Sequence, residues 1–295
     1  MAQDFSHLLL TLFNVRIAFA KADEFARTDW LEHRFQLFES FCYPSVRGQT
    51  NQNFRWIVLF DSRTPKAFRD RIEHYSEWDN FQPYFIDDFE SFKEDQLRYV
   101  VFENSSPGTS FLITTRLDND DALSIDYLQS VQDSFASQDF EFINFPKGYV
   151  LSLSNTGKVR LYQKDGELSN PFISLIESNR CGGFRTLWGC GPHDRLRFVG
   201  NIRQVDSSAR WLQVVHGRNV RNSVEVTSVR IPVHVLDSEF VLKKPFDSIK
   251  DNQFVITLDN SKRRVLAVFL RSKVIIGWYV RKLRAVFGNV PSGRK

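Results

Sequence analysis

Sulfur-containing side chains are scarce in this sequence, whose 295 residues include one Met and three Cys. The cysteines, Cys42, Cys181 and Cys190, are odd in number and lack zinc-ligand spacing even with His193 nearby. This argues against a disulfide framework and against a structural zinc site. The chain also does not open with the basic and then apolar segments of a secretory leader. We therefore expect a protein of the reducing cytoplasm.

Long apolar runs and a strong net charge are absent as well. Stretches such as Val274–Val280 are far shorter than the roughly 20 residues of a membrane-spanning helix. The net charge of +4, from 39 basic and 35 acidic side chains, is too small for a dedicated nucleic-acid-binding protein. The basic surplus lies at the C-terminal end, where every charged residue from Lys262 to Lys295 is Lys or Arg.

Aromatic side chains, in contrast, are abundant. The sequence has 28 Phe, 8 Tyr and 6 Trp, which predicts a core packed with rigid rings. A chain of 295 residues that is 42% hydrophobic and 25% charged is long enough to bury one large α/β core.

Apolar segments of strand length alternate with helical patterns in the first half of the chain. We expect strands at 7–13, 54–60, 81–86 and 111–115, and helices at 30–43, from 64–65 onward, at 91–102 and at 124–135. Asp29 is expected to cap the first of these helices, and Pro44 to follow its end. The alternation predicts an α/β fold with a doubly wound sheet flanked by helices, and ligands at the carboxyl ends of its strands.

The pattern changes after Ala136 to shorter strand-like runs at 141–144, 149–153 and 158–163. We expect one domain over residues 1–260, with a donor half (1–136) and an acceptor half (137–260). Residues 261–295 form a separate C-terminal tail, in which the segment from Lys262 to about Phe287 has the spacing of a basic amphipathic helix.

The most informative motif is the acidic run Asp118-Asn119-Asp120-Asp121, placed where an apolar strand ends. Three carboxylates within four residues repel one another and need a cation or solvent to offset that repulsion. Magnesium or manganese held there would neutralise the diphosphate of a nucleotide-sugar as it departs. The alternative is a solvated turn that caps the helix expected near Ser124.

A second acid, Asp61, ends the preceding apolar strand. Its carboxylate could accept a hydrogen bond from the N3–H of a pyrimidine base, and the alternative role is to cap the helix that begins near Thr64. A glycine-rich loop after the first strand is missing, since Asn14-Val15-Arg16-Ile17-Ala18-Phe19 stands there. This argues against a nucleotidyltransferase that cradles a triphosphate.

These segments together resemble a bacterial rhamnosyltransferase family of the GT-A type over residues 5 to about 225. The resemblance rests on the strand and acid of residues 56–61, on Gln49-Thr50-Asn51-Gln52-Asn53-Phe54 before them, and on the run from Thr115 to Asp121. It implies a GT-A-like mixed sheet, a nucleotide-sugar donor (dTDP-, UDP- or GDP-linked), a glycan or lipid-linked acceptor, and an inverting transfer. The acidic run corresponds to the metal-binding D-x-D motif of that family.

The resemblance also implies roles for individual residues. The nucleotide would contact Thr11, Asn14, Arg16, Asp61, Arg116 and Asp118, and the metal would be held by Asp118 and Asp120, with Asp121 as a second ligand or a supporting carboxylate. For Arg16 and Arg116 the alternative is a surface position or an ion pair.

A further strand-like run, Trp211–Val215, ends in His216. This histidine is expected to be a third metal ligand or a diphosphate contact, with Arg218 and Asn219 as weaker diphosphate contacts. The alternative is a histidine that only ends a strand.

An inverting transferase needs a general base for the acceptor hydroxyl. Asp194 in Gly189-Cys190-Gly191-Pro192-His193-Asp194 is the first candidate and His193 its rival. The alternative is that Asp194 caps a helix and His193 lies on the surface.

The basic tail suggests contact with anionic lipid at the inner face of the membrane, with a helix packed on the domain as the alternative. A non-catalytic module that binds carbohydrate or a membrane surface remains the second functional hypothesis, and it leaves the acidic run unexplained.

Overall fold

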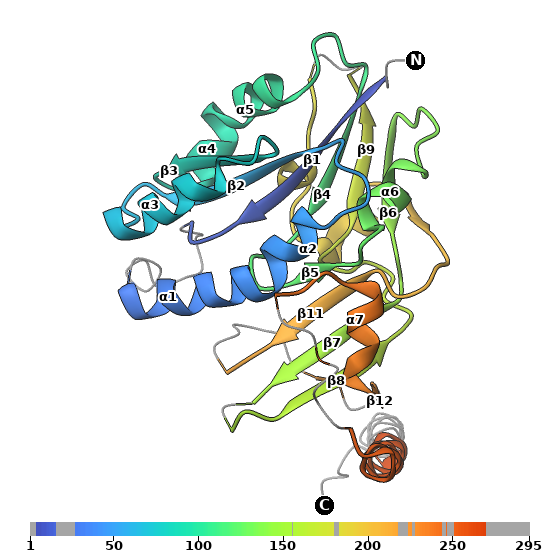
Figure 1. Cartoon of the computed structure of the whole chain (residues 1–295). Helices are drawn as coiled ribbons and strands as arrows, with labels where there is room; N and C mark the ends of the chain where they lie inside the picture. The colour runs from blue at the N-terminus through green and yellow to red at the C-terminus, as the bar shows by residue number, and fades with distance from the viewer. Residues whose placement is uncertain are drawn as a thin grey trace, which may run out of the picture.

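The structure is a computed structural model that describes residues 4–15, 27–154, 156–179, 183–217, 224–225, 228–243, 246 and 251–269. Two mixed β-sheets lie one above the other in Figure 1, with α1 and α2 between them. The expected α/β fold with a mixed sheet flanked by helices is confirmed. The second sheet was not predicted.

The first sheet has seven strands in the order β10-β6-β9-β4-β1-β2-β3. Strands β1 to β4 run parallel, and β9 lies antiparallel between β4 and β6. The expected strands of the first half are confirmed to within about two residues. The strands of this sheet are β1 (Phe5–Leu12), β2 (Arg55–Asp61), β3 (Phe81–Ile86), β4 (Phe111–Arg116), β6 (Phe140–Asn144), β9 (Ser174–Ser178) and β10 (Ile202–Gln204).

The second sheet has five strands in the order β12-β8-β7-β11-β5. Of the three short runs predicted after Ala136, the first became β6 of the large sheet, and the other two pair with each other in the second sheet. The strands are β5 (Ala122–Leu123), β7 (Gly148–Leu153), β8 (Val159–Lys164), β11 (Trp211–Val215) and β12 (Val229–Ile231).

The first helical segment is longer than predicted. It runs through α1 (Thr28–Leu37), a π-helical turn at Phe38–Cys42 and α2 (Tyr43–Arg47). The expectation that Pro44 follows the helix is wrong, because the hydrogen-bond register changes at the π turn and places Pro44 in the first turn of α2, where its missing N–H is harmless. The cap is Arg27 rather than Asp29, which lies in the first turn.

The remaining helices are shorter than the patterns suggested. The helix expected at 91–102 is divided at Gln96 into two, and the one expected at 124–135 is a short helix after β5. The helices are α3 (Lys66–Tyr75), α4 (Phe89–Asp95), α5 (Leu97–Asn104), α6 (Tyr127–Gln132) and α7 (Leu236–Glu239), with 3-10 turns at Leu187–Gly189, His193–Phe198 and Val233–Val235.

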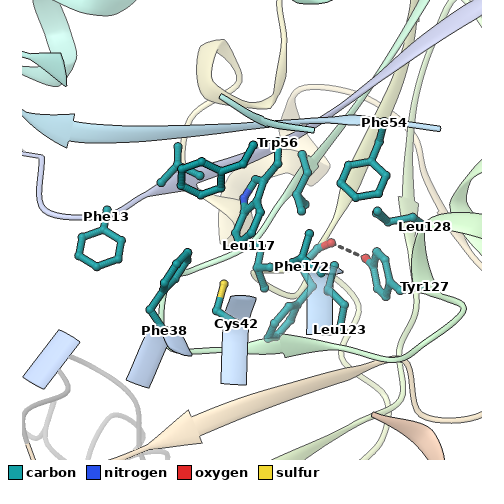
Figure 2. Close-up of a cluster of buried hydrophobic side chains, with 14 of the residues drawn as sticks. Phe13, Phe38, Cys42, Phe54, Trp56, Leu117, Leu123, Tyr127, Leu128 and Phe172 are labelled. Carbon is teal, nitrogen blue, oxygen red and sulfur yellow. Dashed lines mark hydrogen bonds between the residues drawn. The ribbon is translucent and has the colours of Figure 1, made fainter. Parts of the chain in front are cut away.

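Two apolar layers cover the two faces of the large sheet. Leu9 of β1 packs into a layer that contains Phe35 and Trp56, while its neighbours Leu8 and Leu10 point into the opposite layer. This alternation is the two-residue period of a buried strand. The predicted aromatic core is confirmed in Figure 2, where Phe13, Phe38 and Trp56 gather on one face and the Tyr127 hydroxyl donates to the carbonyl of Phe172.

Trp211 joins the two sheets. It lies on β11 of the small sheet, yet its ring belongs to the core of the large one. The indole stacks on Phe172 with the ring centroids 5.0 Å apart and donates Nε1–H to the carbonyl of Phe145 over 2.9 Å. Gly148 is its partner in β7, and a Cβ there would lie 2.1 Å from the ring. A residue without a side chain is therefore required at position 148.

A helix over residues 253–269 follows the second sheet and is the red-orange segment near β12 in Figure 1. It begins nine residues before the predicted start at Lys262, and the rest of the predicted helix lies outside the described residues. Within the described part of the chain, no helix combines the length and the apolar character needed to cross a membrane.

Candidate active site

The acidic turn Asp118–Asp121 connects the two sheets. It leaves β4 of the large sheet and leads directly into β5 of the small one. The backbone N–H of Asp121 donates to the carbonyl of Asp118 over 3.3 Å, and the side-chain amide of Asn119 donates to the carbonyl of Phe13. The turn is thus held at the carboxyl edge of β1 and β4, which is where the sequence predicted it.

Asp120 is the centre of a buried charge cluster. Its Oδ2 accepts from Nη1 of Arg34 over 2.7 Å and lies 3.0 Å from Nε2 of His216. Arg34 and His216 come from α1 and from the end of β11. Burial alone would raise the pKa of Asp120, but the contacts with His216 and Arg34 outweigh it and hold that pKa below its ordinary value. Asp120 is therefore ionised.

His216 has a second partner on α1. Its Nδ1 lies 3.4 Å from Nε2 of His33, with the ring centroids 5.1 Å apart. The sequence predicted His216 at this site but not His33 or Arg34, because the spacing within a helix does not indicate contacts with distant segments. Arg34 contacts the acidic turn, 85 and 86 residues away, and His33 contacts His216, 183 residues away. These two side chains are the main addition that the structure makes to the site.

The side chain of Asp121 is bound to the backbone of β11. It is fully buried, and its Oδ1 accepts from the backbone N–H of Val214 over 2.8 Å. Burial and then the charges of Asp120 and Asp118 raise its pKa well above the ordinary value. Among the described residues its Oδ2 has no hydrogen-bond partner, and neither does the buried Nε of Arg34. Two buried polar atoms of the site thus lack a partner within the described part of the protein.

The predicted acceptor-side residues lie near Asp118. Arg116 and Asp118 form an ion pair of 3.5 Å, with their side chains 32% and 40% exposed. Burial lowers the pKa of His193, and the charge of Arg116 lowers it further, whereas Asp194 and Asp118 act in the opposite direction.

The donor set at the turn suits a hard divalent cation, because it consists of carboxylate oxygens and includes the unpartnered Oδ2 of Asp121. As the side chains are arranged, however, no three His, Cys, Asp or Glu residues in the described part of the chain gather into a group that could hold a metal ion. Arg34 and His216 occupy Oδ2 of Asp120 instead. Metal binding therefore stays a prediction.

Three of the predicted nucleotide contacts, Thr11, Asn14 and Asp61, are buried and form hydrogen bonds within the protein. Asn14 and Asp61 are joined at the carboxyl edge, since the side-chain Oδ1 of Asn14 accepts from the backbone N–H of Asp61 over 3.1 Å. The Asp61 carboxylate accepts from the backbone N–H of Arg63 over 2.7 Å and from its guanidinium. Thr11 is fully buried, and its hydroxyl accepts from Nε1 of Trp56 over 2.9 Å. Their contacts with a nucleotide stay predictions.

Several predicted residues fall outside the described part of the chain: Arg16, Cys181, Arg218 and Asn219. The other two cysteines are both buried thiols. Burial raises the pKa of Cys42 well above its ordinary value, and the charges of the acidic turn, beginning with Asp121, add to this. Cys42 is therefore an un-ionised thiol that packs beneath the site.

The mixed seven-stranded sheet with an acidic turn at the end of β4 fits a sugar transferase of the GT-A type. A family described as "Putative rhamnosyl transferase" matches residues 5–228, and the chain belongs to this family. The resemblance inferred from the sequence is confirmed. No curated protein matches the chain.

Solved structures similar to the chain are distant. S. aureus TarS 1-349 is 10% identical with a TM-score of 0.40, and the match covers 71% of this chain and 60% of that one. The same protein in complex with UDP is 10% identical with a TM-score of 0.39 over 72% and 60%. A "putative nucleotide-diphospho-sugar transferase" from Desulfovibrio desulfuricans G20 is 12% identical with a TM-score of 0.30 over 70% and 81%.

Proposed function

We propose that this protein is a glycosyltransferase that moves a sugar from a nucleotide-sugar donor to a glycan or lipid-linked acceptor. The observation that carries the proposal is the cluster of Arg34, Asp120 and His216 at the carboxyl edge of the sheet, in a chain of a sugar-transferase family. The family description makes rhamnose the first sugar to test. The UDP in the TarS complex makes UDP the first nucleotide to test.

The chemistry of such a transfer is supported by the charges at the site. A nucleoside diphosphate gains negative charge as the bond to the sugar breaks, so positioned cationic donors lower the barrier. The buried Nε of Arg34 is a donor without a protein partner among the described residues. We assign it to a phosphate oxygen of the donor, because a guanidinium presents several N–H groups in one plane and can bind phosphate and Asp120 together.

We also propose that a divalent cation, magnesium or manganese, binds at Asp118 and Asp120 together with the donor, with Asp121 and His216 beside it. Such an ion would supply a Lewis acid that neutralises the diphosphate. The carboxylate donors suit this ion. Arg34 would have to share Asp120 with it, because Arg34 already contacts Oδ2 of that residue.

On the acceptor side, His193 is a fitting general base for an inverting transfer. Burial, followed by the charge of Arg116, lowers its pKa, so the ring is neutral near pH 7 and can accept the proton of an acceptor hydroxyl. Asp194, its neighbour, is the rival for this role. Exchanging each residue separately, His193→Gln and Asp194→Asn, distinguishes the two by the larger loss of turnover.

The test is hydrolysis and transfer with a panel of dTDP-rhamnose, UDP-sugars and GDP-sugars, each with magnesium, with manganese and with EDTA. We expect one donor to be turned over by the wild type, and turnover to fall at least about 100-fold in Asp120→Asn, as for loss of a group that acts in the transition state. Asp70→Asn is the matched control, because Asp70 is 63% exposed on α3.

The result also decides the second hypothesis. If the folded wild type neither binds nor turns over any nucleotide-sugar, the transferase proposal fails and a non-catalytic module is the better description. Turnover that persists in EDTA would keep the transferase and remove the metal from the proposal.

A further inference from the structure

The helix over residues 253–269 is amphipathic in the opposite sense to an ordinary surface helix. The side chains that face the protein are mostly polar. Asn252 caps its first turn by accepting from the backbone N–H groups of Phe254 and Val255. Only Ile256, 3% exposed, is a deeply buried apolar residue of the helix.

Polar contacts attach this helix to β12 and β8. Asn260 exchanges two hydrogen bonds with the backbone of Arg230, of 2.7 and 2.9 Å. Arg263 pairs with Asp259 and lies over the ring of Tyr162, 4.3 Å from its centroid. These residues recur at the spacing of one helix face. The polar face of the helix is thus the one that is docked.

The opposite face is apolar and exposed. Phe254 is 74% exposed, Leu258 45% and Val265 71%, and their separations of four and seven residues place them in one stripe along the helix. Val255 and Leu266, each 45% exposed, lie to one side of this stripe, beyond Lys262. An exposed apolar stripe on a helix whose polar face is already docked is a candidate binding surface.

The charges beside the stripe identify the kind of partner. Lys262 and Arg264 are both exposed, and at 3.6 residues per turn they lie on either side of the stripe near Val265. From Lys262 to the end of the sequence, every charged residue is basic. An apolar stripe bordered by cations matches an anionic lipid surface. Packing against a second copy would instead bring two basic segments together.

We propose that this helix lies in the interface of an anionic phospholipid bilayer, with the stripe of Phe254, Leu258 and Val265 among the acyl chains and Lys262 and Arg264 at the headgroups. The helix thereby attaches the protein to the membrane by its lower end in Figure 1, while its polar face keeps the second sheet attached. This inference does not depend on the transferase activity.

The experiment is co-sedimentation of the full chain, without nucleotide, with vesicles of phosphatidylcholine alone or mixed with phosphatidylglycerol. We expect binding to the anionic vesicles only, and release by high salt. Lys262→Gln with Arg264→Gln should weaken the partition coefficient by roughly 25-fold, at about fivefold for each cation. Phe254→Ser should weaken it by about tenfold, as one large apolar side chain leaves the interface.

The matched control is Phe102→Ser, because Phe102 is 78% exposed on α5 and lies outside this helix. It should bind vesicles like the wild type. Equal binding of the wild type and both helix variants would overturn the proposal. So would a dimer in analytical ultracentrifugation that Phe254→Ser dissociates, because the stripe would then be a contact between two copies. Thermal unfolding of each variant confirms that it is folded.

Discussion

Arg34 and Asp120 lie 86 residues apart in the sequence, and in the structure Nη1 of one is 2.7 Å from Oδ2 of the other. Their side chains are only 12% and 8% exposed, so neither charge can turn to water if its partner is removed. The pair joins α1 to the acidic turn. A substitution of Arg34 therefore tests how much this pair contributes to the free energy of unfolding and whether the pair belongs to the site.

Arg34→Ala should lower the free energy of unfolding by about 3 kcal/mol, because it leaves a buried carboxylate with less compensation. Urea denaturation measures this loss. Arg27→Ala is the control, since Arg27 pairs with Asp29 on the surface with both side chains more than half exposed, and an exposed pair contributes at most about 1 kcal/mol. Equal losses in the two variants would contradict the role of burial.

His7 should make the fold sensitive to acid. Burial lowers its pKa to about 3, because a charged ring would lose its hydration there. The ring nitrogens lie within hydrogen-bond distance of Thr115 and Gln132. The unfolded chain binds a proton near pH 6.5 and the folded chain does not, so stability falls as the pH drops from about 6.5 toward 3, by a few kcal/mol in all. Urea midpoints between pH 7 and pH 4 measure the slope.

The variant His7→Gln should flatten that part of the profile. His74→Gln is the control, because the side chain of His74 is 74% exposed. If the slope between pH 7 and pH 4 is the same in His7→Gln and in the wild type, the acid sensitivity has another source.

Gly148→Ala should be among the most damaging small substitutions in the chain. The added Cβ would lie 2.1 Å from the Trp211 ring, so either the strand pairing of β7 with β11 or the indole must move. We expect a loss of at least about 3 kcal/mol, at the upper end of overpacking. Gly183→Ala, where nothing lies within 4 Å of the new Cβ, should be close to neutral by thermal unfolding.

The large sheet could be predicted because β1 and β2 are largely apolar runs of strand length, as expected of strands with both faces covered. The second sheet could not. Its strand β5 has only two residues, Ala122 and Leu123, which is too short to show an alternating pattern of apolar residues. The segment of β11 was predicted as a strand, but the sequence did not indicate which strands it pairs with.

The site shows the same division. Asp118, Asp120 and Asp121 were predicted because three carboxylates within four residues repel one another, and this is visible in the sequence alone. His33 and Arg34 were missed because their role depends on how α1 crosses the edge of the sheet. The π turn that carries the helix past Pro44 depends on tertiary packing that no local propensity reports.

The link between the sheets has a consequence for the geometry at Asp120. After the acidic turn, Ala122 of β5 pairs with Leu212 of β11, the Asp121 side chain binds the backbone of Val214, and the same strand then reaches His216. Backbone pairing therefore closes a short ring around the acid and its histidine. The strand pairing and the Asp121 contact therefore fix the separation of these two groups, and substitutions in the surrounding loops should leave it unchanged.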